Sequence, residues 1–148
     1  MKLRIIASGS LATGGLLLIG IGIYFAFLRP ALLPEDANYI GASIIQIEGI
    51  GPGMMHWLGR VFDVLGGFIF AAGLLTVYVA LTSFRTGTGG SAWIAAVSGL
   101  ASIGWMAITN FILDSDFKWV LLALTLPWMI ALLLLAASHL VQKVPDSG

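Results

Sequence analysis

The chain contains no cysteine and very little charge, and both absences limit what it can do. Without a thiol it forms no disulfide, thiolate metal site or CxxC redox centre, which excludes oxidoreductases that pass electrons through cysteine pairs. Charged residues make up 9% of the sequence, against about 25% in an average soluble domain. Seven basic and seven acidic residues give zero net charge. Because nucleic-acid binding needs a basic face, we expect no nucleic-acid partner.

Long apolar runs occupy most of the sequence, and they determine the predicted fold class. They lie at residues 5–28, 61–84, 92–113 and 119–141. Each holds at least about 20 residues, enough for a helix to cross a hydrocarbon core of about 30 Å. We predict an all-α integral membrane protein with one transmembrane domain over residues 1–148, a four-transmembrane-helix up-down bundle. Pro127 should kink or locally unwind the last helix, because it removes a backbone donor.

Lys2 and Arg4 precede the first apolar run, which gives the N-terminus the outline of a secretory signal. The run holds about 24 residues, whereas the apolar region of a signal peptide holds 7–15. It ends at Leu28-Arg29-Pro30 without a small-x-small cleavage site. We therefore expect an uncleaved first span.

Lysine and arginine residues near the span ends set the expected orientation. With a cytoplasmic N-terminus, the inner side holds Lys2, Arg4, Arg85 and Lys143, and the outer side holds Arg29, Arg60 and Lys118. The difference is small, but the first helix usually dominates, and its start carries two of the inner charges. We expect a multi-pass protein of a bacterial-type inner (plasma) membrane, surrounded by membrane lipids, with both termini cytoplasmic.

The longest polar segment, residues 29–53, forms the first outer loop in this orientation. Pro34 followed by Glu35 and Asp36 is typical of a helix start, because proline fits the first position and acids favour the first turn. Apolar residues then recur at helical spacing, and Gly49 supplies a stop. We predict one short amphipathic helix of about 13 residues that lies on the membrane surface or caps the bundle.

Small residues spaced three or four apart recur in the second and third spans, and such spacing lets helices approach closely in lipid. They are Gly59, Gly67 and Ala71 in the second span, and Ala95, Gly99 and Ser102 in the third. We expect these two small-residue seams to pack against neighbouring helices. A membrane-protein partner or self-association through small-residue seams stays open.

Polar and ionisable residues concentrate at the outer ends of the second and third spans and in the hairpin that follows. This candidate outer polar cluster consists of His56, Arg60, Asp63, Asn110, Asp114, Asp116 and Lys118. Asp63 shares a face with the first seam, so we expect it to point at a neighbouring helix. An acid inside a span is a functional candidate. The alternative is structural: Asp63 pairs with a basic residue or contacts Asn110, and so joins two helices.

We expect no cofactor and no metal from the histidines. His56 lies at the outer end of one span and His139 at the inner end of another, about 30 Å apart, so one haem cannot join them. His56 and Asp63 supply only two metal ligands, fewer than a site needs. Trp105 and Trp128 should lie near mid-bilayer, where they either fill volume or line a groove for a lipid, quinone or pigment.

Three function classes are compatible with this pattern. The leading hypothesis is a small non-enzymatic accessory, scaffold or assembly subunit of a larger membrane complex, because the sequence offers small-residue seams and no nucleophile–base pair. The first alternative is a homo-oligomeric small transporter or channel component with Asp63 as its proton- or cation-coupling acid. The second is a lipid- or quinone-interacting membrane enzyme, with His56 as general base and Asp114 with Asp116 as a metal pair.

Overall fold

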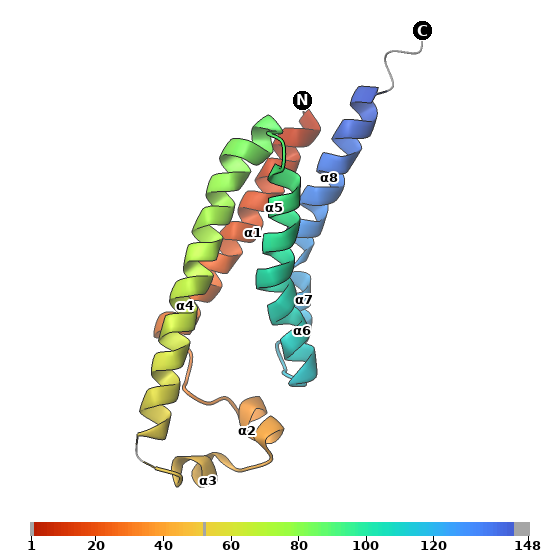
Figure 1. The fold of residues 1–148 in the computed structure, drawn as a ribbon. Helices are drawn as coiled ribbons and strands as arrows, with labels where there is room; N and C mark the ends of the chain where they lie inside the picture. The colour runs from red at the N-terminus through yellow and green to blue at the C-terminus, as the bar shows by residue number, and fades with distance from the viewer. Residues whose placement is uncertain (1, 52, 144–148) are drawn as a thin grey trace.

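Four helical segments of the chain are long and apolar enough to cross a membrane. The computed structural model describes residues 2–51 and 53–143, and the side chains of residues 139 and 141–143 lie outside its description. The four segments are Lys2–Phe27, Met54–Phe84, Ser91–Ile112 and Lys118–Ser138. No strand occurs among the described residues (Figure 1). The prediction of an all-helical chain with four helices able to span a membrane is confirmed.

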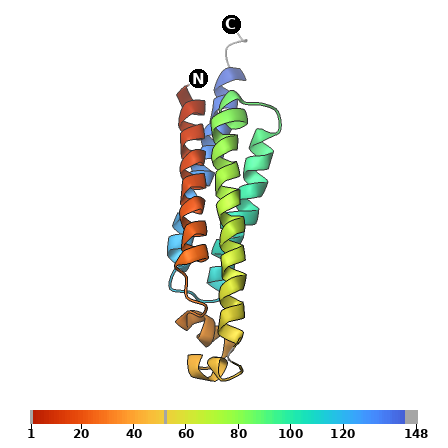
Figure 2. The same cartoon turned by 90° about the vertical axis from the view of Figure 1, so that its left-hand side faces the viewer.

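The first two long helices form the closest pair. These are α1 (Lys2–Phe27) and α4 (Met54–Val79), which continues into the π-helical segment η1 (Ala80–Phe84). Figure 2 shows α1 and α4 side by side along most of their length. Glycines permit this approach: a Cβ atom on Gly66 would lie 2.5 Å from the Ala26 nitrogen, and one on Gly22 would lie 2.5 Å from the Phe70 nitrogen. Only glycine fits at such contacts.

The predicted seam of the second span is not the face that packs against α1. A Cβ atom on Gly67 would meet nothing within 4 Å, Ala71 is exposed, and only Gly59 approaches another segment, with Ala31 4.0 Å away. The contact runs instead through Gly66 and Gly73. A helix turns about 100° per residue, so a seam displaced by one residue faces a different direction. The expected packing of Gly67 and Ala71 within the chain is therefore wrong.

The third long helix meets the fourth through the other predicted seam. It consists of α5 (Ser91–Gly99), the π-helical η2 (Leu100–Gly104) and α6 (Trp105–Ile112). Ala95 is buried, and its carbonyl oxygen accepts a hydrogen bond of 2.9 Å from the indole nitrogen of Trp128. A Cβ atom on Gly99 would lie 2.5 Å from the same indole, so only glycine at this position leaves room for the ring. Ser102 is half-buried and donates to the Ser98 carbonyl oxygen of its own helix.

Pro127 interrupts the fourth long helix, as its chemistry predicts. The segment divides into α7 (Lys118–Ala123) and α8 (Leu126–Lys143), with a turn between them. Proline offers no amide hydrogen for the helical ladder, which ends one turn before it. The Pro127 carbonyl oxygen accepts a hydrogen bond of 2.8 Å from the Ser10 hydroxyl group of α1. The kink is thus tied to the first helix.

The segment that joins α1 to α4 holds two short helices rather than the single one predicted. They are α2 (Pro34–Ile40) and α3 (Ile44–Glu48). Pro34 begins α2 and Gly49 follows α3, as expected from the sequence. Gly41, with a φ of 75°, ends α2 in the left-handed conformation, and the Ser43 side chain accepts from the Gln46 amide to begin α3. This cap pair divides the predicted helix.

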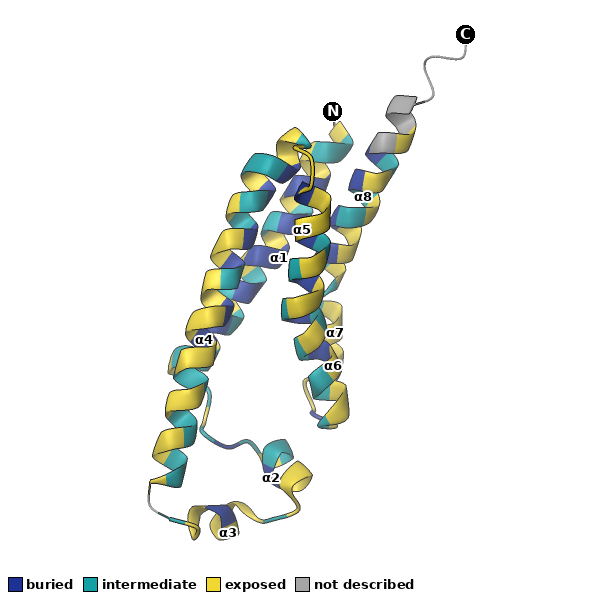
Figure 3. Ribbon diagram, in the orientation of Figure 1, coloured by how far each residue is buried: buried dark blue, intermediate teal, exposed yellow. Residues whose placement is uncertain are grey.

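Burial is uneven along the bundle. The main core includes Leu11, Phe84, Ala131 and Leu135. Buried positions are most frequent along the half of the bundle that carries the N-terminus (Figure 3). The other end carries residues 28–53 and the turn at residues 113–117, and we refer to it as the loop end. There α6 and α7 pack mainly on each other, while α1 and α4 form their own pair. The separation of the two helix pairs leaves room for a cavity.

Candidate functional site

A cavity of about 650 Å³ lies at the loop end between the α1–α4 pair and the α6–α7 pair. Its walls are mostly apolar and include Ile21, Leu65, Met106 and Leu121, one from each of the four helices. Polar side chains line it as well. They are Tyr24, Arg29, Glu35, Asp36, Ser102, Thr109 and Asn110. We refer to this space as the loop-end cavity, and its apolar walls with a few polar groups are typical of a small-molecule site.

Arg29 is the most buried charged side chain of this site, with 6% of its side chain exposed. Its Nη2 atom donates to Asp36 Oδ2 at 2.8 Å, and its Nη1 atom donates to the Pro30 carbonyl oxygen at 2.9 Å. The guanidinium carbon lies 3.5 Å from the ring centre of Phe62 and 5.4 Å from that of Phe25. An ion pair and two aromatic faces therefore compensate the buried charge.

Asp36 holds α2 in place as well as pairing with Arg29. Its Oδ2 atom also accepts a hydrogen bond of 2.9 Å from the backbone nitrogen of Leu33, which precedes the helix. The acid side chain thus serves as a reciprocal cap of the first turn. One carboxylate oxygen connects the end of α1 to the start of α2, so the position of this side of the cavity depends on Asp36.

Glu35 connects the two sides of the cavity opening. The Ser115 hydroxyl group, 1% exposed as a residue, donates to Glu35 Oε1 at 3.2 Å. The same hydroxyl oxygen accepts from the Phe117 amide at 3.1 Å. Ser115 belongs to the turn between α6 and α7, whereas Glu35 belongs to α2. Arg29, Asp36 and Glu35, one positive and two negative groups, thus line the part of the cavity beside α2, and we refer to this part as the cavity opening.

The α6 wall contributes an amide with hydrogen-bonding capacity to spare. Asn110 Nδ2 donates to the Met106 carbonyl oxygen of its own helix at 2.9 Å. An asparagine side chain carries two amide hydrogens and an accepting oxygen, so this bond uses only part of its capacity. Thr109 precedes it on the same wall. The predicted site residue Asn110 is therefore part of the cavity.

Arg60 and Asp63 lie outside the cavity. Arg60 Nη1 donates to Asp63 Oδ2 at 2.9 Å within α4, and the two side chains are 85% and 41% exposed. Asp63 pairs with a basic residue, as the structural alternative expected, but the partner lies on its own helix. The expectation that Asp63 points at a neighbouring helix is wrong, because it shares the outward face of Gly67 rather than the inward face of Gly66.

Asp114 and Lys118 form a second pair within the turn that joins α6 to α7. The Lys118 ammonium group donates to Asp114 Oδ1. This hydrogen bond, and then the lysine charge, lower the pKa of Asp114, and slight desolvation opposes them. Asp116 is exposed beside them, and His56 is exposed in the first turn of α4. Among the described residues, no ion pair joins the α4 pair to this one, so the predicted cluster does not converge.

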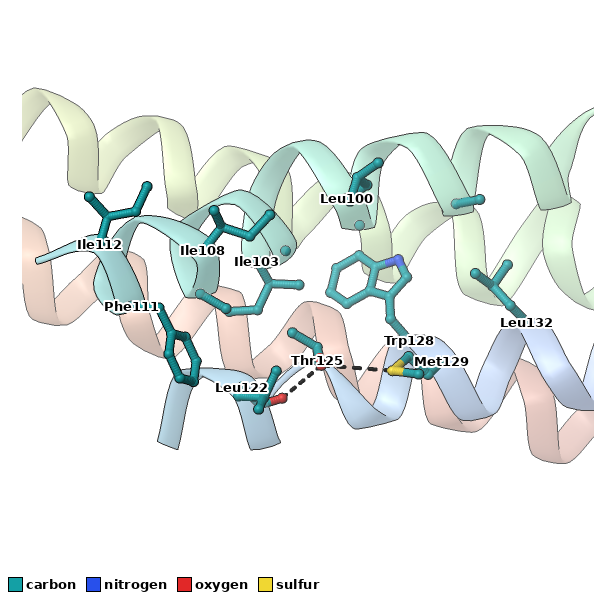
Figure 4. Close-up of a pocket in the computed structure, with 14 residues that line it drawn as sticks. Leu100, Ile103, Ile108, Phe111, Ile112, Leu122, Thr125, Trp128, Met129 and Leu132 are labelled. Atoms are coloured by element: carbon teal, nitrogen blue, oxygen red, sulfur yellow. Dashed lines mark hydrogen bonds between the residues drawn. The ribbon is translucent and has the colours of Figure 1, made fainter. Parts of the chain in front are cut away.

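A second hollow of about 640 Å³ lies between α6 and the α7–α8 kink (Figure 4). Apolar side chains such as Ile108, Phe111 and Leu132 line it, and Trp128 forms its base. Its one hydroxyl group, that of Thr125, donates to the Leu122 carbonyl oxygen at 2.7 Å. This groove has no polar group free to orient a ligand, which is typical of a surface covered by lipid tails.

Trp128 performs the packing role expected of a mid-membrane tryptophan. It is 3% exposed, and its indole nitrogen is bonded to the Ala95 carbonyl oxygen. It also borders the groove. A lipid, quinone or pigment in that groove stays a prediction. Trp105 differs: it is largely exposed on α6, yet part of it lines the loop-end cavity.

Sequence reasoning missed Arg29, Glu35 and Asp36 as site residues. It used Arg29 only to orient the chain, and the two acids only to start a helix. The available signal was an arginine directly after an apolar run, four residues from Phe25, since a cation at that position needs a partner. The sequence does not show that the chain turns at Pro30 and returns Asp36 to Arg29.

These features define an all-helical protein with four helices able to span a membrane and a partly apolar cavity at one end. In the described part of the chain, no three histidine or acidic residues gather where they could hold a metal ion. No protein-family model, curated protein or solved structure matches the chain.

Proposed function

We propose that this chain is a non-enzymatic, multi-pass membrane protein that acts as an accessory, scaffold or assembly subunit of a larger membrane complex. In this proposal its four long helices run up and down through a bacterial-type inner membrane. Both termini are cytoplasmic, and residues 29–53 lie outside, with the short helices at the membrane surface. The positive charges at the start of α1 support this orientation.

The unused small-residue face of α4 is the observation that carries the proposal. Gly67 and Ala71 are exposed, whereas the neighbouring glycines at positions 66 and 73 pack against α1. One helix thus carries two small-residue faces, and the described residues of the chain occupy only one of them. Helices associate in lipid through such faces, because small side chains let two backbones approach. A helix of a partner protein fits this surface.

Replacing Gly67 with leucine tests this proposal. We expect the parent protein, purified from native membranes in mild detergent, to retain a second membrane protein, and Gly67→Leu to lose it. Gly20→Leu is the matched control, because Gly20 is an exposed glycine of α1 with nothing within 4 Å of its Cβ position. A parent protein that migrates as a bare monomer without a co-purifying protein would overturn the proposal.

The transporter alternative gains no support from the position of Asp63. This acid lies outside the loop-end cavity and is paired with Arg60 on an exposed face of α4. The enzyme alternative also gains no support. It needs Asp114 and Asp116 as a metal pair, but Asp114 accepts a hydrogen bond from Lys118, and Asp116 is exposed beside it. Neither arrangement brings a reactive group to the cavity.

A further inference from the structure

The loop-end cavity has no role in the scaffold function proposed above. We propose that it binds one membrane lipid whose headgroup carries a primary amine. The hydrocarbon chain lies between the α1–α4 and α6–α7 pairs, and the amine lies at Glu35. This proposal goes beyond the scaffold function and does not depend on it, because it concerns an internal site rather than the outward face of α4.

The size and lining of the cavity indicate a long apolar occupant. Its 650 Å³ falls within the range of about 300–1,000 Å³ that ligand sites occupy. The walls come from the apolar spans, so most of the space lies beside lipid tails. Protein interiors are close-packed, and an empty space of this size would forfeit many dispersion contacts. Along the leucine and isoleucine walls water is a poor substitute, because these walls offer it no hydrogen bonds.

The lipid has a route into the cavity from the membrane. Between the kink at Pro127 and the loop end, α6 and α7 pack mainly on each other rather than on α1 and α4. The cavity is partly open rather than sealed. A chain can therefore enter sideways from the surrounding bilayer, while its headgroup stays at the level of residues 29–36. Only an amphiphile satisfies both the apolar interior and the polar opening.

The charges at the opening select the headgroup. Arg29 and Asp36 neutralise each other at 2.8 Å, so the carboxylate of Glu35 is the charge in excess. Glu35 accepts one hydrogen bond, from Ser115, and a carboxylate has several further acceptor positions. An ammonium group there forms a charge-assisted hydrogen bond. A headgroup with net negative charge meets repulsion instead, because the opening already carries a net charge of −1.

The opposite wall accommodates the neutral part of a headgroup. Asn110 retains an amide hydrogen and an accepting oxygen beyond its bond to Met106, and Thr109 lies beside it. These groups suit the ester and phosphate oxygens that link an amine headgroup to its chains. A zwitterionic aminophospholipid thus matches the cavity in length, apolar surface and charge.

Native mass spectrometry of the full chain in mild detergent tests the proposal. The probes are phosphatidylethanolamine, phosphatidylglycerol and a long-chain benzoquinone, each added separately. We expect one bound phosphatidylethanolamine, held about tenfold more tightly than phosphatidylglycerol. Glu35→Gln should reduce this preference to about one, because it removes the excess charge. Glu48→Gln is the matched control, since Glu48 is an exposed acid of α3 that does not line the cavity.

A second pair of variants tests occupancy independently of charge. Leu121→Trp fills part of the cavity and should abolish retention of the lipid. Leu133→Trp makes the same change on an exposed face of α8 outside the cavity and should leave retention unchanged. Circular dichroism and gel filtration confirm that each variant is folded. Equal retention of the two phospholipids, preference for the quinone, or unchanged binding in both Glu35→Gln and Leu121→Trp would overturn the proposal.

Discussion

Arg29 shows how a charge is held at the end of an apolar helix. The guanidinium group leaves water but gains Asp36, a backbone carbonyl oxygen and the faces of Phe25 and Phe62. Removing one partner of such a pair leaves the other charge buried and uncompensated, which strongly destabilises the folded state. The same residue fixes the start of α2 through Asp36. A single side chain therefore contributes both to stability and to the position of α2 beside the cavity.

Arg29→Ala should lower the free energy of unfolding by about 3 kcal/mol, because Asp36 then stays largely buried without its cation. Unfolding in detergent, followed by circular dichroism, measures this loss. Arg60→Ala is the control: it breaks an exposed pair within α4 and should change stability by less than about 1 kcal/mol. Equal effects of the two substitutions would contradict the role assigned to Arg29.

Asp114 gives the loop end a stability that depends on pH. Lys118 lowers its folded pKa below the ordinary value of 3.8, so the contribution is present above that value. It is lost as the pH falls through the lower folded pKa, because the proton then removes the ion pair. Asp114 has a φ of 52°, which asparagine also tolerates. Asp114→Asn should therefore keep the turn and remove this pH dependence.

Thermal unfolding measured from neutral to acidic pH tests this expectation. The difference in melting temperature between the parent and Asp114→Asn should shrink as the pH falls below 3.8. A difference that grew on acidification would have the wrong sign. Asp116→Asn serves as a control, because Asp116 is an exposed acid of the same turn and no pairing with Lys118 involves it.

At the scale of the helices, two neighbouring glycines of α4 differ in their surroundings. A Cβ atom on Gly66 would lie 2.5 Å from the Ala26 nitrogen, whereas one on Gly67 would meet nothing within 4 Å. We expect Gly66→Ala to destabilise the isolated chain by about 1–3 kcal/mol through overpacking. Gly67→Ala should be neutral or stabilising by up to about 1 kcal/mol, since alanine is the better helix former.

Denaturant titration of both variants in the same detergent compares them directly. The pair is matched in chemistry and differs by one position in sequence, so helix propensity cancels. A loss of stability in Gly67→Ala equal to that in Gly66→Ala would contradict the assignment of the packed face. Gly22→Ala should behave like Gly66→Ala, because its Cβ position lies 2.5 Å from the Phe70 nitrogen.

Length and hydropathy were sufficient to predict the long helices, because crossing a bilayer demands about 20 apolar residues wherever they pack. The helix break at Pro127 was equally predictable, since the effect of proline is local and covalent. The packed face of α4 could not be predicted in this way. In a helix surrounded by lipid, both faces are apolar, so the polar–apolar contrast that identifies the inner face of a soluble helix is missing. Gly66 and Gly67 look alike in the sequence.

The candidate site was harder to predict than the fold because its parts meet only through turns. Asn110 was found because it closes the third apolar run one turn before Asp114. Arg29 and Asp36 come together only because Pro30 and the cap at Leu33 reverse the chain. Glu35 and Ser115 are 80 residues apart in the sequence. Local patterns carry no information on such contacts, which depend on the packing of the whole bundle.

For the whole molecule, the absence of cysteine makes the proposed orientation directly testable, because any introduced thiol is the only one present. Asp116 lies exposed at the loop end. Gly89 lies in the turn between η1 and α5, where a Cβ atom would meet nothing within 4 Å. Both positions accept a cysteine without disturbing packing. The proposed topology places them on opposite sides of the membrane, with Gly89 on the side of the N-terminus.

We expect Asp116→Cys to react with a membrane-impermeant maleimide in intact cells, and Gly89→Cys to react only after the membrane is permeabilised. The reason is electrostatic: Lys2 and Arg4 begin α1, and positive charge near the first span is retained on the cytoplasmic side. The reverse labelling pattern would mean that the other lysine and arginine residues, rather than Lys2 and Arg4, determine the orientation. Reaction of both cysteines in intact cells would contradict an up-down arrangement, and with it the entry of a lipid between the two helix pairs.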